Sequence, residues 1–176
     1  PRVRRQRQMC IRDRATGEKL SDYVSRKLWT PMHAEESALW SLDRKDGMEK
    51  AYCCFNSNAR DFARFGQLLL NNGQWDGQQL ISPAYLAEAT SPDTRLVYKD
   101  LGKPNHCYGF QYWILDYKGM KIPYMRGILG QYVFTLPEKN AVIVRLGHKR
   151  SDTYTADQHY PDDINTWLDA AMDLLQ

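Results

Sequence analysis

The sequence predicts an α+β protein in which a helical part is followed by an antiparallel sheet and a final helix. Two apolar runs, 131–136 and 141–146, flank a short polar turn at 137–140, a pattern typical of a β-hairpin. Residues 59–70 carry apolar side chains at helical spacing, and so do residues 161–175. Helices grouped before and after the strands, rather than alternating with them, indicate the α+β class.

The N-terminal part is expected to hold one helix and one small hairpin. Residues 18–29 place four apolar side chains on one helical face, and Pro31 should end this helix. His33 is expected in the loop that follows, as a surface or structural residue. Residues 37–43 and 49–55 are short extended candidates on either side of an evident turn at 44–47.

The helix at 59–70 has clear start and stop signals. Asn58 is a good N-cap, and Asp61, three residues later, can complete a capping box. We therefore interpret Asp61 and Arg64 as structural. Gly73, after two asparagines, should end the helix. A second helix is expected from Pro83 to about residue 90, followed by a linker without periodicity at 91–106.

The sheet is expected in the second half of the chain. Residues 108–114 read as an aromatic strand, and both faces of the 131–146 hairpin are mostly apolar. Strands that are apolar on both faces belong to a sheet that is covered on both sides. The final helix should lie on one of those faces through its apolar stripe of Ile164, Trp167, Leu168, Ala171, Met172 and Leu175.

Composition narrows the possible functions. Six arginines against one aspartate give residues 1–14 a charge of +5, which leaves −2 for the rest of a chain whose total is +3. This arm could bind nucleic acid, but it has no aromatic residue to stack on a base, and we interpret residues 1–14 as a foreign extension outside the fold. No apolar run reaches the roughly 20 residues of a membrane span.

The four cysteines do not suggest a metal site. Cys10, Cys53, Cys54 and Cys107 show no Cys-x-x-Cys spacing, and an adjacent pair is poorly placed to chelate one ion. We expect buried free thiols, no metal and no cofactor.

Several segments together resemble one enzyme family. Gly-Ile-Leu-Gly-Gln at 127–131, an aromatic strand, a Pro-Glu-Lys-Asn turn and a Val-Ile-Val strand resemble the serine hydrolases of the class C β-lactamase superfamily, in the branch of the 6-aminohexanoate-dimer (nylon-oligomer) hydrolases. The string SNARDFARFGQLLLNNGQWDGQQLIS resembles that family's helix and following turn. The resemblance covers most of the chain from Ala15 and implies a β-lactamase/transpeptidase-like fold, with a helical lobe at 15–105 and a sheet part at 106–176.

The nucleophile of such an enzyme is not in this sequence. The family uses Ser-x-x-Lys and Tyr-x-Asn, and neither motif occurs here: Ser25 is followed at the third position by Leu28, and Ser41 by Arg44. No Gly-x-Ser-x-Gly elbow is present either. Because the family order places both motifs upstream, we expect this chain to be the C-terminal portion of a hydrolase and to be inactive by itself.

The third active-site segment of the family is present. Aligning Gly127 with the glycine of the family's Lys-Thr-Gly strand places Ile128 where the family donates an oxyanion-hole N–H. The resemblance implies substrate contacts from Arg126, Gly130 and Gln131 on this cleft-edging strand, and from Tyr112. The glycines could also serve only to ease a bend, and sheet packing explains Tyr112 equally well.

Two residues depart from the family pattern. Met125 and Arg126 stand where β-lactamases have Lys and Thr, and methionine cannot pair with a substrate carboxylate. Arg126 could replace that lysine, although strand alternation would turn its side chain to the other face. The departure argues against β-lactams and favours a small-molecule amide or ester as substrate.

Three functions therefore compete: a hydrolase that forms an acyl-enzyme, an inactive binding or sensor domain on the same fold, and a nucleic-acid-binding protein that uses the arginine arm. We rank them in that order. Because any signal peptide would lie upstream, the sequence leaves the compartment open between cell envelope and cytoplasm, and it leaves the oligomeric state open as well.

Overall fold

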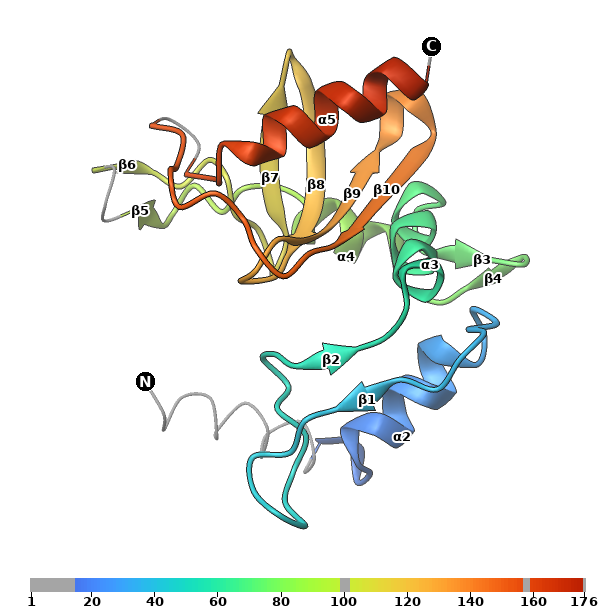
Figure 1. Cartoon of the computed structure of the whole chain (residues 1–176). Coiled ribbons are helices and arrows are strands. Elements are labelled where there is room, and N and C mark those ends of the chain that lie inside the picture. The colour runs from blue at the N-terminus through green and yellow to red at the C-terminus, as the bar shows by residue number, and fades with distance from the viewer. Residues whose placement is uncertain (1–14, 99–101, 157–158, 176) are drawn as a thin grey trace. The chain divides into compact units, whose positions relative to one another are not determined.

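The computed structural model describes residues 15–98, 102–156 and 159–175, and these divide into two compact units at Asp61 and Phe62. Figure 1 shows the chain from the N-terminal helix to the C-terminal helix. The organisation into a helical part at 15–105 and a sheet part at 106–176 stays a prediction. Within the described ranges, no helix combines the length and the apolarity that crossing a bilayer requires.

The first unit contains the expected helix and a small two-stranded sheet. The helix has an α-helical part and a π-helical part, and Leu42 bridges Glu49 across the expected turn. His33 lies in the loop after the helix with a positive φ of 53°. The elements of this unit are α2 (Leu20–Val24), η1 (Ser25–Trp29), β1 (Leu39–Trp40) and β2 (Phe55–Asn56).

The expectation of free thiols at Cys53 and Cys54 is wrong: these neighbours form a disulfide. They belong to a turn at 51–54 in which Cys54 has a left-handed backbone conformation (φ 70°), so that the two sulfur atoms can meet. Cys107 is a buried free thiol, as expected, and Cys10 lies outside the described residues.

Asn58 is confirmed as the N-cap of α3 (Ala59–Leu70), but Asp61 reaches back to the side chain of Asn58 and not to its backbone N–H, so the capping box is only half formed. The Asp61 N–H donates to Asn58 Oδ1 at 2.8 Å, and Asn58 Nδ2 donates to Asp61 Oδ2 at 2.7 Å. The fully buried carboxylate of Asp61 also accepts the backbone N–H groups of Glu35 (2.8 Å) and Glu36 (3.1 Å). Asp61 therefore joins the loop at 35–36 to the start of α3, which is the structural role expected for it.

The second unit is built around a four-stranded antiparallel sheet in the order β10-β9-β8-β7. The hairpin is confirmed: Leu136 pairs with Ala141, and Asn140 takes the left-handed conformation in the turn (φ 48°). The elements of the sheet are β7 (Trp113–Tyr117), β8 (Met120–Arg126), β9 (Gln131–Leu136), the turn η2 (Pro137–Lys139) and β10 (Ala141–Leu146).

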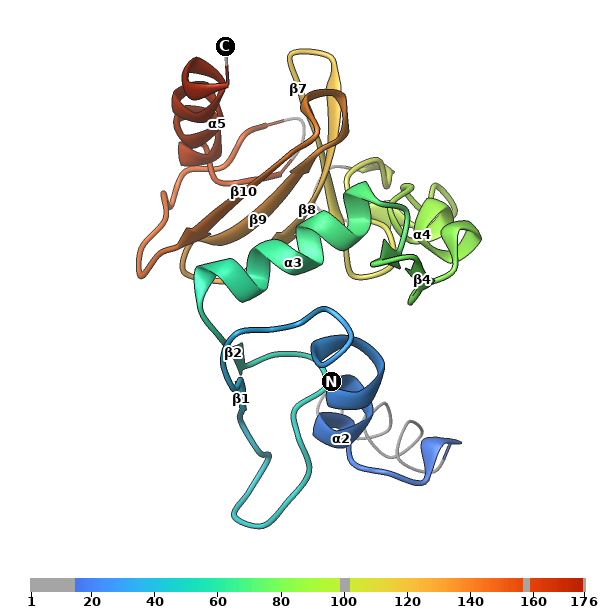
Figure 2. The same cartoon turned by 90° about the vertical axis from the view of Figure 1, so that its right-hand side faces the viewer.

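Helices cover both faces of this sheet, as the apolar strands predicted. Figure 2 shows α5 (Asp163–Leu174) on one face and α3 on the other. Ile164 and Leu168 of α5 are fully buried in a core with the side chains of Tyr124, Tyr132, Phe134 and Leu136. On the opposite face Gly66 of α3 touches the strands so closely that a Cβ there would lie 2.4 Å from Val142 Cγ1.

Two sequence expectations need correction in this unit. The aromatic strand starts at Trp113, not at residue 108, because the chain folds back in a tight loop: Tyr108 bridges Trp113, and Gln111 has a φ of 65°. Trp167 is 43% exposed, at the margin of the helix stripe, where the Arg145 guanidinium covers its ring at 4.5 Å.

Shorter elements connect α3 to the sheet. The helix α4 begins with proline at its first position, as expected, although Ser82 makes no side-chain cap bond. The linker at 91–106 includes a small hairpin that the sequence did not indicate. These elements are β3 (Gln74–Trp75), β4 (Gln78–Gln79), α4 (Pro83–Ala89), β5 (Val97–Tyr98) and β6 (Lys103–Pro104).

Candidate active site

The segment expected to carry the oxyanion hole forms the turn between β8 and β9, which we call the oxyanion turn (residues 127–130). It is a turn and not a strand, and it joins the two central strands of the described sheet. The Gly127 N–H donates to the Gln131 carbonyl at 2.8 Å, and the Leu129 N–H donates to Gln131 Oε1 at 3.1 Å. Gln131 thus stabilises the turn through two hydrogen bonds, and its side-chain nitrogen Nε2 also donates to the Gly147 carbonyl.

Ile128 lies at the exposed tip of the oxyanion turn. Its side chain is 80% exposed, and its N–H donates no hydrogen bond to any residue that the structure describes. The Ile128 carbonyl, in contrast, accepts a hydrogen bond from Arg150 Nε at 2.9 Å. A backbone donor without an acceptor, in a turn whose neighbouring groups are bonded, can bind an external oxygen atom.

Both glycines of the turn are required by its geometry. A Cβ on Gly127 would lie 2.3 Å from Gln131 Oε1. Gly130 has a φ of 83°, and a Cβ there would lie 2.4 Å from the Lys149 carbonyl oxygen. The close approaches at these glycines are therefore made by the protein's own atoms, which favours the bend-forming interpretation of Gly127 and Gly130.

Arg126 lies within a cluster of aromatic side chains next to the turn. Its guanidinium covers the Trp113 ring at 3.4 Å from the ring centroid, and Nη1 donates to the His159 carbonyl at 3.1 Å. Burial raises the pKa of Tyr124, and the charge of Arg126 opposes that shift. Arg126 is thus ordered by the protein itself, and its role in substrate binding stays a prediction.

Tyr112 is not brought to the oxyanion turn by any contact among the described residues. It precedes β7, next to Trp113, and burial together with the nearby Tyr85 of α4 raises its pKa to about 12. Its proposed contact with substrate stays a prediction.

Arg150 and Tyr154 belong to the surroundings of the turn, although no sequence motif marks them. Arg150 donates from Nη1 to the Ser151 carbonyl at 2.7 Å, and its guanidinium covers the Tyr154 ring at 5.0 Å. Arg150 is separated from Ile128 by 22 residues. Only the return of the chain after β10 brings the two together, so a local pattern could not have revealed the contact.

No nucleophile is found at this site in the described part of the chain. Burial raises the pKa of the Cys107 thiol, which therefore stays protonated near neutral pH. Among the described residues, no group of three or more His, Cys, Asp or Glu side chains could hold a metal ion.

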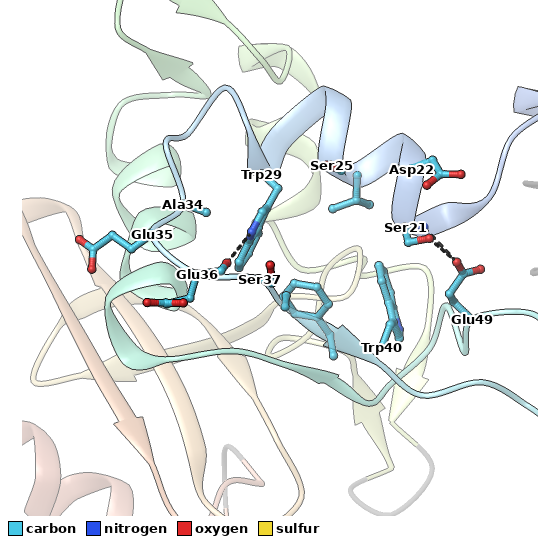
Figure 3. Close-up of a pocket in the computed structure, with 13 residues that line it drawn as sticks. Ser21, Asp22, Ser25, Trp29, Ala34, Glu35, Glu36, Ser37, Trp40 and Glu49 are labelled. Atoms are coloured by element: carbon cyan, nitrogen blue, oxygen red, sulfur yellow. Dashed lines mark hydrogen bonds between the residues drawn. The ribbon is translucent and has the colours of Figure 1, made fainter.

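A separate hollow of about 520 Å³ lies in the first unit (Figure 3). Its walls include the rings of Trp29, Trp40 and Phe55, which meet edge to face at 5.2 and 5.0 Å. Ser21 Oγ donates to the buried carboxylate of Glu49 at 2.5 Å in this hollow. None of the side chains that line it is Lys, Tyr or His, so its serines lack a base of the kind that serine hydrolases of this type use.

The fold defines the class of protein. A structure from Bacteroides dorei assigned as a β-lactamase superimposes with a TM-score of 0.60 and 13% identity, over 90% of this chain and 53% of that one. At this identity the match shows the fold alone: the chain has part of a β-lactamase-type fold.

Two proteins to which the chain is similar carry the name of one hydrolase. A 6-aminohexanoate-dimer hydrolase of Paenarthrobacter ureafaciens is 27% identical over 140 residues, which are 77% of this chain and 35% of the relative. The structure of a Bacillus anthracis protein assigned to the same hydrolases matches with a TM-score of 0.72 and 26% identity, over 95% of this chain and 40% of that one. No family model matches the chain.

These similarities support the resemblance to the β-lactamase-like serine hydrolase superfamily that the motifs predicted. The chain spans only 35–53% of the length of these relatives.

Proposed function

We propose that the complete protein is a serine hydrolase that cleaves an amide or ester bond through an acyl-enzyme, and that this chain supplies one side of its oxyanion hole. The observation that carries the proposal is that the N–H of Ile128 has no acceptor among the described residues, while Ile128 itself is 80% exposed in a turn closed by its own hydrogen bonds. The homology to a 6-aminohexanoate-dimer hydrolase supports the same conclusion.

The proposed reaction assigns a limited role to the residues of this chain. A serine Oγ from a Ser-x-x-Lys motif in the rest of the protein attacks the carbonyl carbon of the substrate, and its proton passes to the neighbouring base. The carbonyl electron pair moves to the oxygen, which the Ile128 N–H and a second N–H stabilise. When the electron pair returns to form the carbonyl again, the bond to the amine or alcohol breaks, and the base gives this leaving group its proton. Water then hydrolyses the acyl-enzyme by the same steps, which restores the serine.

The substrate that we propose is a small linear amide or ester. The named relatives act on the dimer of 6-aminohexanoate, whose two units are joined by one amide bond. Met125 stands at the position where β-lactamases carry the lysine that pairs with a carboxylate, and a thioether cannot form that pair. This difference supports an amide or ester substrate over a β-lactam.

The proposal is tested by comparing this chain with the complete protein. The 176-residue chain should hydrolyse chromogenic esters and cephalosporins only at the background rate. The complete protein should turn over amide or ester substrates, and a fluorophosphonate should label one serine outside this chain, identified by mass spectrometry. Labelling of a serine within the chain, with turnover that the reagent abolishes, would refute the assignment.

The alternative of an inactive binding or sensor domain makes a different prediction for the same experiment. The complete protein would then bind amides without turnover and would not react with the fluorophosphonate. The absence of Ser-x-x-Lys from this chain is compatible with both functions, so the labelling of the complete protein decides between them.

A further inference from the structure

The two peptide planes on either side of Ile128 are held very differently. The plane between Ile128 and Leu129 is fixed at both ends: Arg150 Nε binds the Ile128 oxygen at 2.9 Å, and the Leu129 N–H binds Gln131 Oε1 at 3.1 Å. The plane between Gly127 and Ile128 carries the proposed oxyanion donor, and no hydrogen bond from the described residues holds that N–H. The direction of the Ile128 N–H therefore depends on the adjoining peptide plane between Ile128 and Leu129.

Packing does not fix this donor. The Ile128 side chain is 80% exposed and that of Leu129 is 49% exposed, so the tip of the turn has little apolar contact. Gly127, on the other side, has no side chain to restrict its backbone. Without the bond from Arg150, the Leu129 N–H would make the one remaining hydrogen bond between Ile128 or Leu129 and the rest of the described residues.

Arg150 is itself held in place. Its Nη1 donates to the Ser151 carbonyl at 2.7 Å, and its guanidinium covers the Tyr154 ring at 5.0 Å. Its side chain forms no ion pair with a carboxylate in the described part of the chain, and its Nε is committed to the Ile128 oxygen. A planar guanidinium that is stacked and bonded at two nitrogens is a rigid support for a carbonyl group.

We propose that Arg150 is a positioning residue for the oxyanion turn: by fixing the Ile128 carbonyl, it orients the Ile128 N–H toward the substrate oxygen. This inference rests on the proposed hydrolase function. Arg145 has a different task, because it binds the carbonyls of Gly130 and Lys149 at the inner end of the turn. Arg150 acts on the exposed end, where the donor lies.

A positioning role has a kinetic signature that a general structural role lacks. The oxyanion exists only in the transition state and intermediate, so a misdirected N–H lowers kcat and leaves KM nearly unchanged. We expect Arg150→Met in the complete protein to lower kcat roughly 10- to 100-fold, less than the full loss of one oxyanion donor. Arg150→Lys can still donate to the carbonyl and should recover part of that loss.

The matched control is Lys149→Met, which removes a neighbouring exposed positive charge and leaves the backbone carbonyl that Arg145 binds. Its kcat should equal that of the wild type. A loss of the same size in Lys149→Met would show that net charge and not the bond to Ile128 matters, and would overturn the proposal.

A second readout does not depend on catalysis. In the complete protein labelled with ¹⁵N-isoleucine and ¹⁵N-leucine, Arg150→Met should increase the mobility of the Ile128 and Leu129 amides in relaxation measurements, while the amides of Ile143 and Leu136 in the strands stay rigid. An unchanged turn in Arg150→Met would overturn the proposal.

The two readouts separate this proposal from the proposed function. A complete wild-type protein without turnover refutes the hydrolase function. A wild-type enzyme with normal turnover, whose Arg150→Met variant keeps both kcat and KM, refutes the positioning role alone.

Discussion

Replacing Ile128 by proline deletes the proposed oxyanion donor and removes little else. The N–H that is lost has no acceptor among the described residues, and the side chain that is lost is 80% exposed. Ile128 does not have a positive φ, and the preceding Gly127 tolerates the restriction that proline imposes on its neighbour. We therefore expect the free energy of unfolding to fall by less than about 1 kcal/mol.

The expected effect on catalysis is much larger than the effect on stability. Loss of one oxyanion-hole hydrogen bond typically lowers kcat by roughly 10²–10³, which corresponds to about 2.7–4 kcal/mol of transition-state stabilisation. Ile128→Val keeps the backbone donor and changes only an exposed side chain, so its kcat should stay near that of the wild type.

The measurement is kcat for an ester or amide substrate with the complete protein, divided by the concentration of titrated active sites. Tyr132→Pro is the contrasting variant: it places proline in the central strand β9 at a residue that is 1% exposed, so it should lower the amount of folded protein. If Ile128→Pro retains wild-type kcat per active site, the assignment of this N–H to the oxyanion hole is wrong.

Two further predictions concern stability. Asp61→Ala removes the carboxylate that accepts the Glu35 and Glu36 N–H groups and that bonds to Asn58. In urea denaturation it should lower the free energy of unfolding by about 2–4 kcal/mol, and Asp61→Asn should lie between this variant and the wild type. A loss below about 0.5 kcal/mol for Asp61→Ala would contradict this role. Burial raises the pKa of Tyr132 to about 12, so between about pH 10 and 12 the unfolded chain loses a proton that the folded chain keeps, and stability should fall by up to about 1.4 kcal/mol per pH unit from this group. Tyr132→Phe should reduce this fall in stability at alkaline pH. At pH 7 it should change the free energy of unfolding little, because the buried Tyr132 hydroxyl has no partner among the described residues. If the variant loses stability above about pH 10 as steeply as the wild type, the raised pKa of Tyr132 is not the cause.

The sequence by itself determined the elements whose signals are local. The 131–146 hairpin, the N-cap bond between Asn58 and Asp61, and the glycine stop of α3 all depend on residues within a few positions of each other, and the structure confirms them. The motifs also predicted the resemblance to β-lactamase-like hydrolases, which the similar proteins support.

Local sequence signals were misleading where backbone conformation or contacts distant in sequence determine the structure. The aromatic run at 108–114 has strand composition, but a bridge between Tyr108 and Trp113 turns its first half into a loop. Adjacent cysteines gave no sign that Cys53 and Cys54 would pair, because pairing depends on the left-handed turn at Cys54.

The environment of the candidate site was decided by tertiary structure. The sequence indicated Gly127 and Ile128, but it did not show that the segment is a turn, that Gln131 closes it, or that Arg150 holds its outer carbonyl. These contacts arise because the chain after β10 returns to the turn between β8 and β9. This return depends on the register of β8, β9 and β10 and not on residues close to the turn in sequence. The proposed oxyanion donor is thus marked by its neighbours in sequence, while the residues that we propose to orient it are brought to it only by the folded sheet.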